Sequence, residues 1–339
     1  MGTDNFPYRL TSCVWEITLA CCFSCRYCGS SGGKARENEL TTDECLNVAD
    51  MLAELGCLRV SLIGGEVFMR RDWEKILSRL SSHGMRVNVI TNGFAFGEEL
   101  VSRLRDAGAE SVSVSLDGPE DIHDKYRQKG SYARALGAVE ILSGAGFPVS
   151  VISTLNSENA PRLGELYRIL RNYPLYAWQL QACSPMGNAA RSGIDCAFDF
   201  REVIRFVEEH RGTAPFALGV ADNIGYFSPE EGNVRGASSA VFPGCSAGLT
   251  TIGIDSAGNV RGCESMYDDR FIEGNLRERT LREIWEDPDG FAYNRKFDPS
   301  LLTGKCGVCP HGAYCAGGCR SYNYFTCGRL YESVRCARG

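Results

Sequence analysis

Three cysteines near the amino terminus have the spacing of metal-cluster ligands. Cys21, Cys25 and Cys28 form a C-x3-C-x2-C pattern directly after the short apolar run 14–20. A cubane of four irons takes four ligands, so three cysteines leave one iron open to another molecule. One alternative is a zinc site, although zinc sites usually show paired C-x2-C units. Another is the overlapping C-x2-C-x2-C pattern that begins at Cys22.

A second chemical motif, Gly64-Gly65-Glu66, follows the next apolar run at 58–63. Together with the three cysteines it resembles the radical S-adenosylmethionine (SAM) enzymes. In that family the open iron is chelated by the amino and carboxylate groups of SAM, and the Gly-Gly-Glu segment holds the methionyl amine. The resemblance implies cleavage of SAM to a 5′-deoxyadenosyl radical that abstracts a substrate hydrogen. Val67 stands where many members have proline, a position that ligates nothing.

The same resemblance suggests further SAM contacts. Tyr27, between the second and third cysteines, is expected against the adenine. Ser115 and Asp117, in a Ser-Leu-Asp-Gly segment, resemble the ribose-binding segment. An arginine is expected at the SAM carboxylate, because a guanidinium fork matches that group. The remaining candidates are Thr91 and Asn92 for the ribose, Arg127 or Arg134 for the carboxylate, and Thr154, Asn156, Gln179 and Gln181 as lining of the cavity.

Eight more cysteines lie near the carboxyl terminus: Cys245, Cys263, Cys306, Cys309, Cys315, Cys319, Cys327 and Cys336. Their spacing resembles the SPASM domain, which binds two auxiliary 4Fe-4S clusters. The resemblance assigns auxiliary cluster I to Cys245, Cys263 and Cys319, and auxiliary cluster II to Cys306, Cys309, Cys315 and Cys336. Cys327 is either a fourth ligand of cluster I or a bystander, so cluster I can keep an open iron. The competing interpretation is a zinc ribbon formed by Cys306, Cys309, Cys315 and Cys319.

Two acidic residues are candidates for accepting a proton where the oxidation of a substrate releases one. Glu264, immediately after Cys263, is the first candidate, and Asp268 is the second. A carboxylate close to the reacting atoms can act as a general base. The alternative for both residues is an ordinary solvated acid.

The composition excludes several classes of protein. The chain has 339 residues, a net charge of −6 and a pI of about 5.4. That balance argues against a nucleic-acid partner and against a basic membrane-binding face. No apolar run approaches the roughly 20 residues that cross a bilayer, and the first residues lack the features of a signal peptide. We therefore expect a cytoplasmic protein, in which 17 cysteines indicate metal rather than disulfides.

The elements that must position these residues alternate regularly along the chain. Strands are predicted at 14–20, 58–63, 86–91, 111–116, 149–155 and 178–181, and helices at 42–55, from 73, 100–107, 133–145, 161–172 and 200–210. Six strand–helix units predict an α/β fold with a parallel sheet, open as a partial (β/α)6 barrel. Functional loops then gather at the carboxyl ends of the strands. The predicted domains are a lead-in at 1–12, the radical SAM barrel at 13–227, a linker at 228–244 and a small SPASM domain with a β-hairpin and short helices at 245–339.

SPASM proteins mostly modify ribosomally made peptides, through thioether or carbon–carbon crosslinks or residue oxidation. The resemblance therefore implies a peptide-modifying radical SAM oxidoreductase with three 4Fe-4S clusters and a one-electron donor such as flavodoxin or ferredoxin. Only a dozen residues precede the first predicted strand, so a separate leader-binding protein or the barrel itself is expected to hold the precursor. The alternatives are oxidation or rearrangement of a small molecule, such as an aminosugar or a cofactor precursor, and an iron–sulfur electron carrier, which needs no Gly64-Gly65-Glu66.

Overall fold

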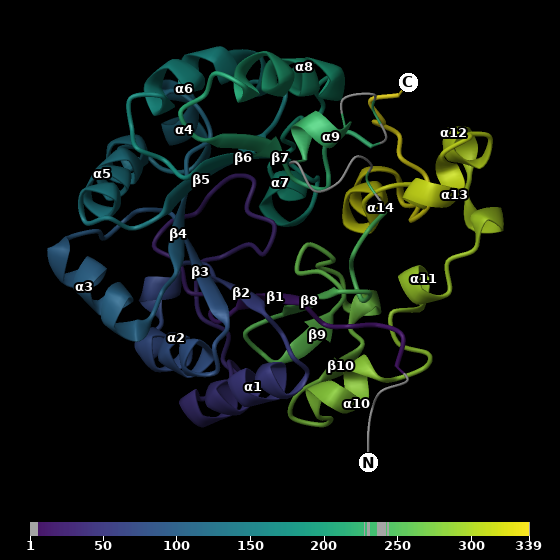
Figure 1. Ribbon diagram of the computed structural model, residues 1–339, viewed down its shortest axis with the longest axis horizontal. Helices are drawn as coiled ribbons and strands as arrows, with labels where there is room; N and C mark the ends of the chain where they lie inside the picture. Colours follow the sequence, from purple (N-terminus) through teal and green to yellow (C-terminus); the bar gives the residue numbers. More distant parts are fainter. Residues whose placement is uncertain (1–5, 227, 229–230, 236–241, 243, 339) are drawn as a thin grey trace.

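The computed structural model describes residues 6–226, 228, 231–235, 242 and 244–338. Within them, ten strands form one sheet in the order β10-β9-β8-β1-β2-β3-β4-β5-β6-β7 (Figure 1). Neighbours from β1 to β7 are parallel, β8 is parallel to β1, and β9 and β10 continue antiparallel. The strands are β1 (Ser12–Glu16), β2 (Arg59–Ile63), β3 (Arg86–Thr91), β4 (Ser111–Ser115), β5 (Val149–Leu155), β6 (Ala177–Ala182), β7 (Ala217–Val220), β8 (Thr251–Ile254), β9 (Asn259–Arg261) and β10 (Gly274–Asn275).

Helices cover the outside of the curved sheet, and the carboxyl-terminal segment lies at its open side (Figure 1). The outer helices are α1 (Thr42–Glu54), α2 (Trp73–Ser82), α3 (Glu98–Ala107), α4 (Glu120–Tyr126), α5 (Ser131–Gly144), α6 (Leu163–Leu170) and α8 (Phe200–Arg211). The shorter ones are α7 (Gly187–Arg191), α9 (Glu231–Val234), α10 (Leu281–Trp285), α11 (Ala292–Arg295), α12 (Gly304–Gly307), α13 (Gly312–Cys315) and α14 (Arg320–Cys327), with 3₁₀ turns η1 (Val67–Met69), η2 (Ala160–Arg162), η3 (Asp269–Phe271) and η4 (Pro299–Leu301).

Local sequence explains why these elements form. Along β5, buried and half-buried residues alternate, so one face of the strand packs against the helices and the other faces the inside of the barrel. At α1 the amide of Thr41 donates to the Glu44 carboxylate at 2.7 Å, and the Glu44 amide donates to the Thr41 hydroxyl at 3.3 Å. This capping box satisfies two amides that a helix start leaves unpaired. Trp15, Val89 and many other apolar residues fill the core between sheet and helices.

The predicted partial barrel is confirmed, with three differences. The first strand occupies residues 12–16 rather than 14–20, because the chain leaves the sheet after Glu16 and turns into the cysteine loop. A seventh parallel strand, β7, and the short helix α4 were missing from the prediction. The expected hairpin after Cys245 does not stand apart, because its first strand, β8, pairs with β1 from Ser12–Thr251 to Trp15–Ile254. An exposed strand edge is satisfied by that pairing, and the residues after β9 are thereby held beside β1.

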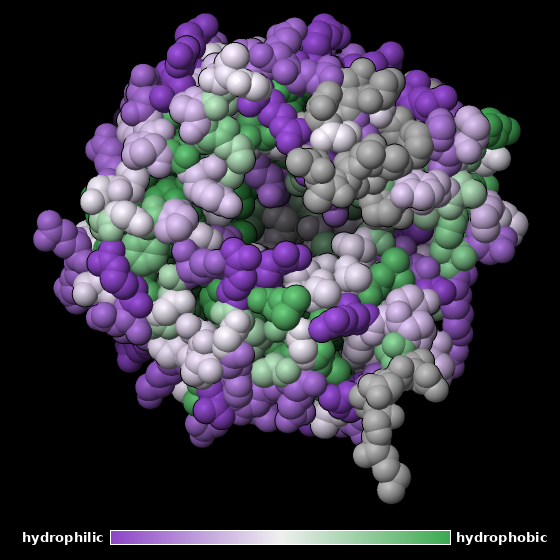
Figure 2. Space-filling model, in the orientation of Figure 1, coloured by the Kyte–Doolittle hydropathy of each residue, from purple (hydrophilic) through white to green (hydrophobic). Residues whose placement is uncertain are grey.

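The predicted linker 228–244 lies largely outside the described residues. Among the described residues, no helix has the length and apolar character that a bilayer crossing requires. The face shown in Figure 2 is hollowed near its middle, on the concave side of the curved sheet seen in Figure 1.

Candidate active site

The loop after β1 brings the three amino-terminal thiols together. Cys21 is an electrostatic neighbour of both Cys25 and Cys28. The amide of Phe23 donates to the sulfur of Cys21 at 3.4 Å, and the amide of Gly32 donates to the sulfur of Cys28 at 3.2 Å. Such amides stabilise thiolates, the form that binds metal. Burial raises the pKa of Cys25 to about 12, so that metal binding must displace its proton.

Cys22 takes a different position from Cys21. Its thiol lies beside Cys21 and 3.6 Å from the side-chain amide of Asn92. Cys25 and Cys28, by contrast, both have Cys21 as their neighbour. The arrangement favours the C-x3-C-x2-C spacing over the one that begins at Cys22.

The Gly64-Gly65-Glu66 segment lies directly against the chain that leads into the cysteine loop. The amide of Gly65 donates to the Thr18 carbonyl, and the amide of Glu66 donates to the Ala20 carbonyl, each at 2.7 Å. A Cβ atom at Gly65 would lie 2.3 Å from the Ala20 oxygen, and one at Gly64 would lie 2.8 Å from the Thr18 oxygen. Only glycine allows the two backbones to approach this closely, and the approach places Glu66 beside the cysteines.

The carboxylate of Glu66 is buried, with 3% of the residue exposed. It accepts hydrogen bonds from the Thr91 hydroxyl and from the Asn92 amide, each at 2.8 Å. Burial raises its pKa to about 7. No ion pair involves Glu66 within the described part of the chain, so the carboxylate is suited to receive an ammonium group. Thr91 and Asn92, expected as ribose contacts, are engaged here in holding Glu66.

Asp117 connects four separate segments. Its carboxylate accepts hydrogen bonds from the Tyr27 hydroxyl, from Nε of Arg127 at 2.5 Å and from the Thr154 amide at 2.8 Å. Its own amide donates to Nδ1 of His123 at 3.2 Å. Burial alone would raise the pKa of this carboxyl, which is 1% exposed, but the Arg127 guanidinium holds it below its ordinary value. The aromatic residue of the cysteine loop is therefore tied to β4, α4 and β5.

Two of the residues expected to touch SAM thus bind each other. Arg127 pairs with Asp117, and its guanidinium lies 5.4 Å from the centre of the Tyr27 ring. Direct contacts of Asp117 with the ribose and of Arg127 with the SAM carboxylate stay predictions. Arg134, the other candidate, is exposed, and its guanidinium lies 4.7 Å from the centre of the Phe94 ring.

The remaining cavity candidates lie on the inner face of the sheet. On β6, Trp178 and Leu180 enter the outer core, so Gln179 and Gln181 point the other way. The side-chain amide of Gln181 donates to the Thr154 hydroxyl at 3.0 Å. Ser115, the last residue of β4, is half-buried on the same face. Asn156 is different, because it is buried, and its side chain accepts hydrogen bonds from the amides of the turn that follows it.

The carboxyl-terminal cysteines separate into two groups. Cys319 has Cys245 and Cys263 as electrostatic neighbours. Cys315 has Cys306, Cys309 and Cys336 as neighbours, and Cys336 has Cys306 and Cys309. These are the two ligand sets implied by the resemblance. The neighbours of Cys319 lie outside the C-x2-C-x5-C-x3-C run, which argues against a zinc ribbon made of that run.

Within the described residues, no three histidine, cysteine or acidic side chains converge closely enough to hold one metal ion. The ligands of a cubane lie farther apart, because each binds a different iron. Cys327 lies on the cluster II side, where it is a neighbour of Cys306, and its thiol donates to the Asn323 carbonyl at 3.2 Å. That position favours a bystander over a fourth ligand of cluster I.

Glu264 lies beside the inner face of β8. A Cβ atom at Gly253 would lie 2.3 Å from the Glu264 amide nitrogen, so glycine is what lets this segment approach the strand. Glu264 is 6% exposed, and neither carboxylate oxygen has a hydrogen-bond partner among the described residues. Burial, reinforced by the charge of Glu16, raises its pKa well above the ordinary value. An uncommitted buried carboxyl of this kind is typical of a proton-transfer residue.

Asp268, the second candidate, is committed elsewhere. Its carboxylate accepts a hydrogen bond from the Tyr324 hydroxyl at 2.8 Å and forms an ion pair with Arg270 at 3.1 Å. It also accepts from the Arg270 amide at the start of η3. These contacts indicate a structural role for Asp268.

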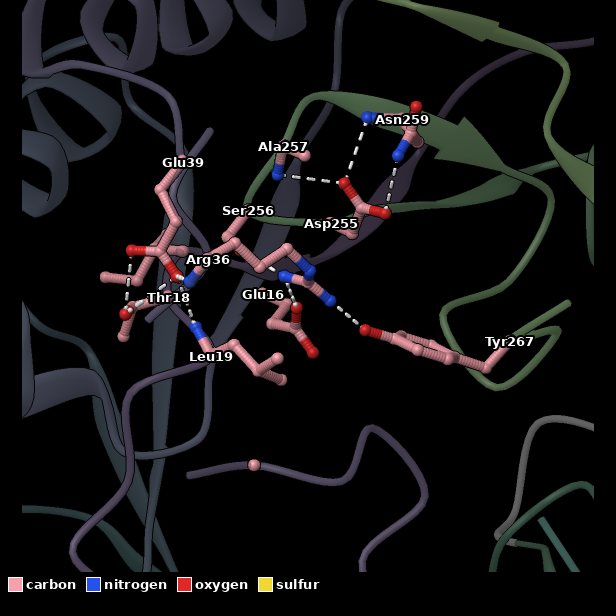
Figure 3. A network of polar contacts seen from close by, with 12 residues as sticks. Glu16, Thr18, Leu19, Arg36, Glu39, Asp255, Ser256, Ala257, Asn259 and Tyr267 are labelled. Carbon is pink, nitrogen blue, oxygen red and sulfur yellow. Dashed lines mark hydrogen bonds and ion pairs between the residues drawn. The ribbon is translucent and has the colours of Figure 1, made fainter. Parts of the chain in front are cut away.

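The sequence patterns did not predict a polar network around Arg36 (Figure 3), although two of its members, Glu16 and Arg36, are electrostatic neighbours of Glu264. Arg36, from the cysteine loop, forms an ion pair with Glu16 of β1 at 2.6 Å and donates to the hydroxyls of Ser256 and Tyr267. It therefore joins the cysteine loop to the segments after β8 and β9. The available signal was Glu16 itself, an acid inside the apolar run 14–20.

Two family models match the chain. Residues 15–170 match the radical SAM superfamily, and residues 245–310 match SPASM, an iron–sulfur cluster-binding domain.

Individual proteins are similar over most of the chain. It is 30% identical to an AdoMet-dependent heme synthase of Methanosarcina barkeri, an alignment that spans 94% of this chain and 93% of that protein. It is 28% identical to the mycofactocin maturase MftC of Mycolicibacterium smegmatis, over 92% and 79%. The crystal structure of Streptococcus suis SuiB bound to S-adenosylmethionine superposes with a TM-score of 0.78 at 16% identity, over 97% of this chain and 77% of SuiB.

Proposed function

Because this chain belongs to the radical SAM superfamily and carries a SPASM domain, we propose that it oxidatively modifies a ribosomally made peptide. The product is a thioether or carbon–carbon crosslink, or an oxidised residue. SAM and 4Fe-4S clusters are its cofactors. The proposal rests on one combination of features. The two carboxyl-terminal cysteine groups occur together with the buried carboxyl of Glu264, which has no hydrogen-bond partner among the described residues, and with Glu66, which is 3% exposed. The molecule is also hollowed near the middle of the face shown in Figure 2.

The similarity to MftC, which is named as a mycofactocin maturase, supports a peptide substrate. A second candidate also has a specific observation in its favour. The heme synthase of Methanosarcina barkeri aligns over nearly its whole length at 30% identity, and its name indicates a small-molecule product. A cofactor precursor related to heme is therefore the alternative substrate.

The residues present fit the cofactors. Cys21, Cys25 and Cys28 would hold the SAM-binding cluster, and Glu66 would hold the methionyl amine. When bound, the cluster and SAM would supply the one-electron radical chemistry by which hydrogen is removed from a substrate. The chain contributes the geometry: Gly65 permits the close approach of Glu66, and Asp117 holds Tyr27 in place. Burial of these groups keeps water from the reactive position.

Glu264 would receive the proton that the oxidation releases. Its carboxylate is buried, and neither oxygen has a hydrogen-bond partner among the described residues, so it is free to take up that proton. Cys245, Cys263 and Cys319 would hold auxiliary cluster I next to Glu264. Glu264 directly follows Cys263, one of the residues that would hold this cluster.

We further propose that the one-electron partner is an acidic protein such as flavodoxin or ferredoxin. A groove beside the cluster II cysteines is lined by four cationic side chains, Arg201, Lys305, Arg335 and Arg338, and one acidic side chain, Asp199. Val308, next to Cys309, also lines the groove and is 87% exposed. A cationic groove on a chain of net charge −6 is complementary to an acidic partner. Replacing Lys305 with Glu should weaken flavodoxin binding, whereas Lys75→Glu on the distant α2 should not.

The test of the proposal compares substrates. Anaerobically reconstituted enzyme is reduced with dithionite and supplied with SAM and, separately, with peptides encoded next to its gene and with a porphyrin precursor of heme. We expect 5′-deoxyadenosine in all cases and a mass loss of about two hydrogens in a peptide. Modification of the porphyrin alone would replace the peptide proposal with its alternative. The absence of any 5′-deoxyadenosine would contradict both.

A further inference from the structure

Arg320 is a fully buried arginine without an acidic partner. It is 0% exposed and directly follows Cys319, at the first position of α14. No carboxylate forms an ion pair with it within the described residues. Among the residues that the structure describes, its guanidinium donates to four carbonyl oxygens, those of Ala316 (2.5 Å), Gly318 (3.3 Å), Leu330 (3.2 Å) and Tyr293 (3.4 Å).

This arrangement leaves a positive charge uncompensated. Arginine stays protonated inside proteins, and an unpaired buried charge destabilises the folded chain. Carbonyl dipoles and the ring of Tyr331, 4.6 Å away, offset part of that cost. The remainder calls for an anion nearby.

The anions that the surroundings can supply are cysteine thiolates from both ligand groups. The electrostatic neighbours of Arg320 include Cys245 and Cys319 from the first group and Cys315 from the second. Two of the carbonyls that it binds, those of Ala316 and Gly318, belong to the segment joining Cys315 to Cys319. Arg320 therefore lies between the two cysteine groups and is bonded to the chain that links them.

We propose that Arg320 is a positioning residue shared by the two auxiliary clusters, whose positive charge stabilises their reduced state. A cluster held by thiolates gains a negative charge when it takes up one electron, and a cation in a low-dielectric interior favours that form. The inference depends on the clusters and their ligands, not on the identity of the substrate. It assigns to this chain a means of keeping the auxiliary clusters ready to accept the electron left on a product.

The chain offers a matched control in Arg295. This arginine is half-buried, and it donates to the carbonyls of Gly248 and Trp285, each at 2.8 Å, with the Trp285 ring 4.6 Å away. The groups whose charges act most on the pKa of Arg295 are Tyr8, Glu273, Tyr293 and Asp287, and none of them is a cysteine. Replacing Arg295 removes a half-buried cation that also donates to carbonyls, at a position that should not affect the clusters.

The experiment measures reduction potentials without substrate. Holoprotein carrying Cys25→Ala, which removes the SAM-binding cluster, is titrated with dithionite while the reduced auxiliary clusters are followed by electron paramagnetic resonance. Adding Arg320→Gln should make one-electron reduction of at least one cluster tenfold less favourable, a shift of about 59 mV to lower potential. Arg320→Lys keeps the positive charge, so its reduction potentials should stay close to those of the parent protein. Arg295→Gln should leave the potentials unchanged.

The outcomes that overturn the proposal are specific. Arg320→Gln with full auxiliary iron and unchanged potentials would refute it, as would an equal shift in Arg295→Gln. If Arg320→Gln loses the clusters, the Arg320→Lys variant decides between the two explanations. Clusters and potentials that are retained in Arg320→Lys support a role for the charge. A loss of iron in Arg320→Lys equal to that in Arg320→Gln refutes the proposal. If the unmodified protein, without Cys25→Ala, bound only about four irons per chain, that result would contradict the two auxiliary clusters on which the proposal depends.

Discussion

The buried ion pair between Asp117 and Arg127 allows a sharp test of how the SAM site is held. In Asp117→Asn the side chain keeps its shape but loses its charge. The Arg127 guanidinium, 10% exposed, then stays buried without a counter-ion, and the Tyr27 hydroxyl and Thr154 amide lose a charged acceptor. If the network positions the cysteine loop, both the stability of the fold and the affinity for SAM should fall.

The magnitude follows from burial. Removing one partner of a buried, hydrogen-bonded ion pair costs roughly 3–5 kcal/mol, because the other charge is left uncompensated. Exposed pairs contribute about 1 kcal/mol or less. Asp50 provides the comparison, because its ion pairs with Arg79 and His83 join side chains that are 32–46% exposed. Asp50→Asn should therefore cost much less than Asp117→Asn.

The assay is urea unfolding of the anaerobic holoprotein, followed by circular dichroism. With a slope of about 3 kcal/mol per molar urea, Asp117→Asn should lower the midpoint by roughly 1 M or more. Asp117→Asn/Arg127→Met should recover part of this loss, because neither charge is then stranded. Isothermal titration with SAM should show weaker binding by Asp117→Asn. A midpoint shift no larger than that of Asp50→Asn, with unchanged SAM affinity, would refute the argument.

Four further predictions concern single residues. Gly65→Ala should weaken SAM binding at least tenfold by calorimetry, because its Cβ meets a carbonyl oxygen, whereas Gly33→Ala, with no atom within 4 Å of the new Cβ, should not. Cys25→Ala should lower the iron content from about twelve to about eight per chain. Glu264→Gln should slow product formation roughly 100-fold while 5′-deoxyadenosine formation persists; equal slowing of both would remove its role as proton acceptor. Burial lowers the pKa of His123 from 6.5 to about 4. The free energy of unfolding should therefore fall by roughly 3 kcal/mol as the pH drops from 6.5 to 4. Urea titrations of His123→Asn should show a smaller loss over the same pH range.

The sign of the last effect follows from proton uptake. Above pH 6.5 the histidine is neutral in both the folded and the unfolded chain. As the pH falls towards 4, the unfolded chain binds a proton that the buried imidazole does not, so unfolding becomes more favourable. Stability that rises as the pH drops through this window would contradict the burial of a neutral His123.

Local spacing, through the resemblance to radical SAM and SPASM proteins that it carries, was sufficient to predict the family of this protein. The three thiols of the cysteine loop, the Gly64-Gly65-Glu66 turn and the Thr41–Glu44 helix start each lie within a few residues of chain, where covalent geometry limits how far the groups can separate. Alternating apolar runs likewise predicted the parallel sheet, because a strand buried on both faces and a helix with one apolar stripe differ in sequence pattern. The missed strand β7 has only four residues, too few for such a pattern.

Contacts between distant segments were decided by the tertiary structure alone. Asp117 has the same local sequence whether it faces a ribose or an arginine; it is the placement of α4 after β4 that gives it Arg127. Pairing of β8 with β1 brings Glu264 beside Glu16, 248 residues earlier, and the fold of 315–319 sets Arg320 between two groups of thiols. Sequence spacing records how far apart residues lie along the chain, whereas burial and charge depend on which segments the curved sheet brings together.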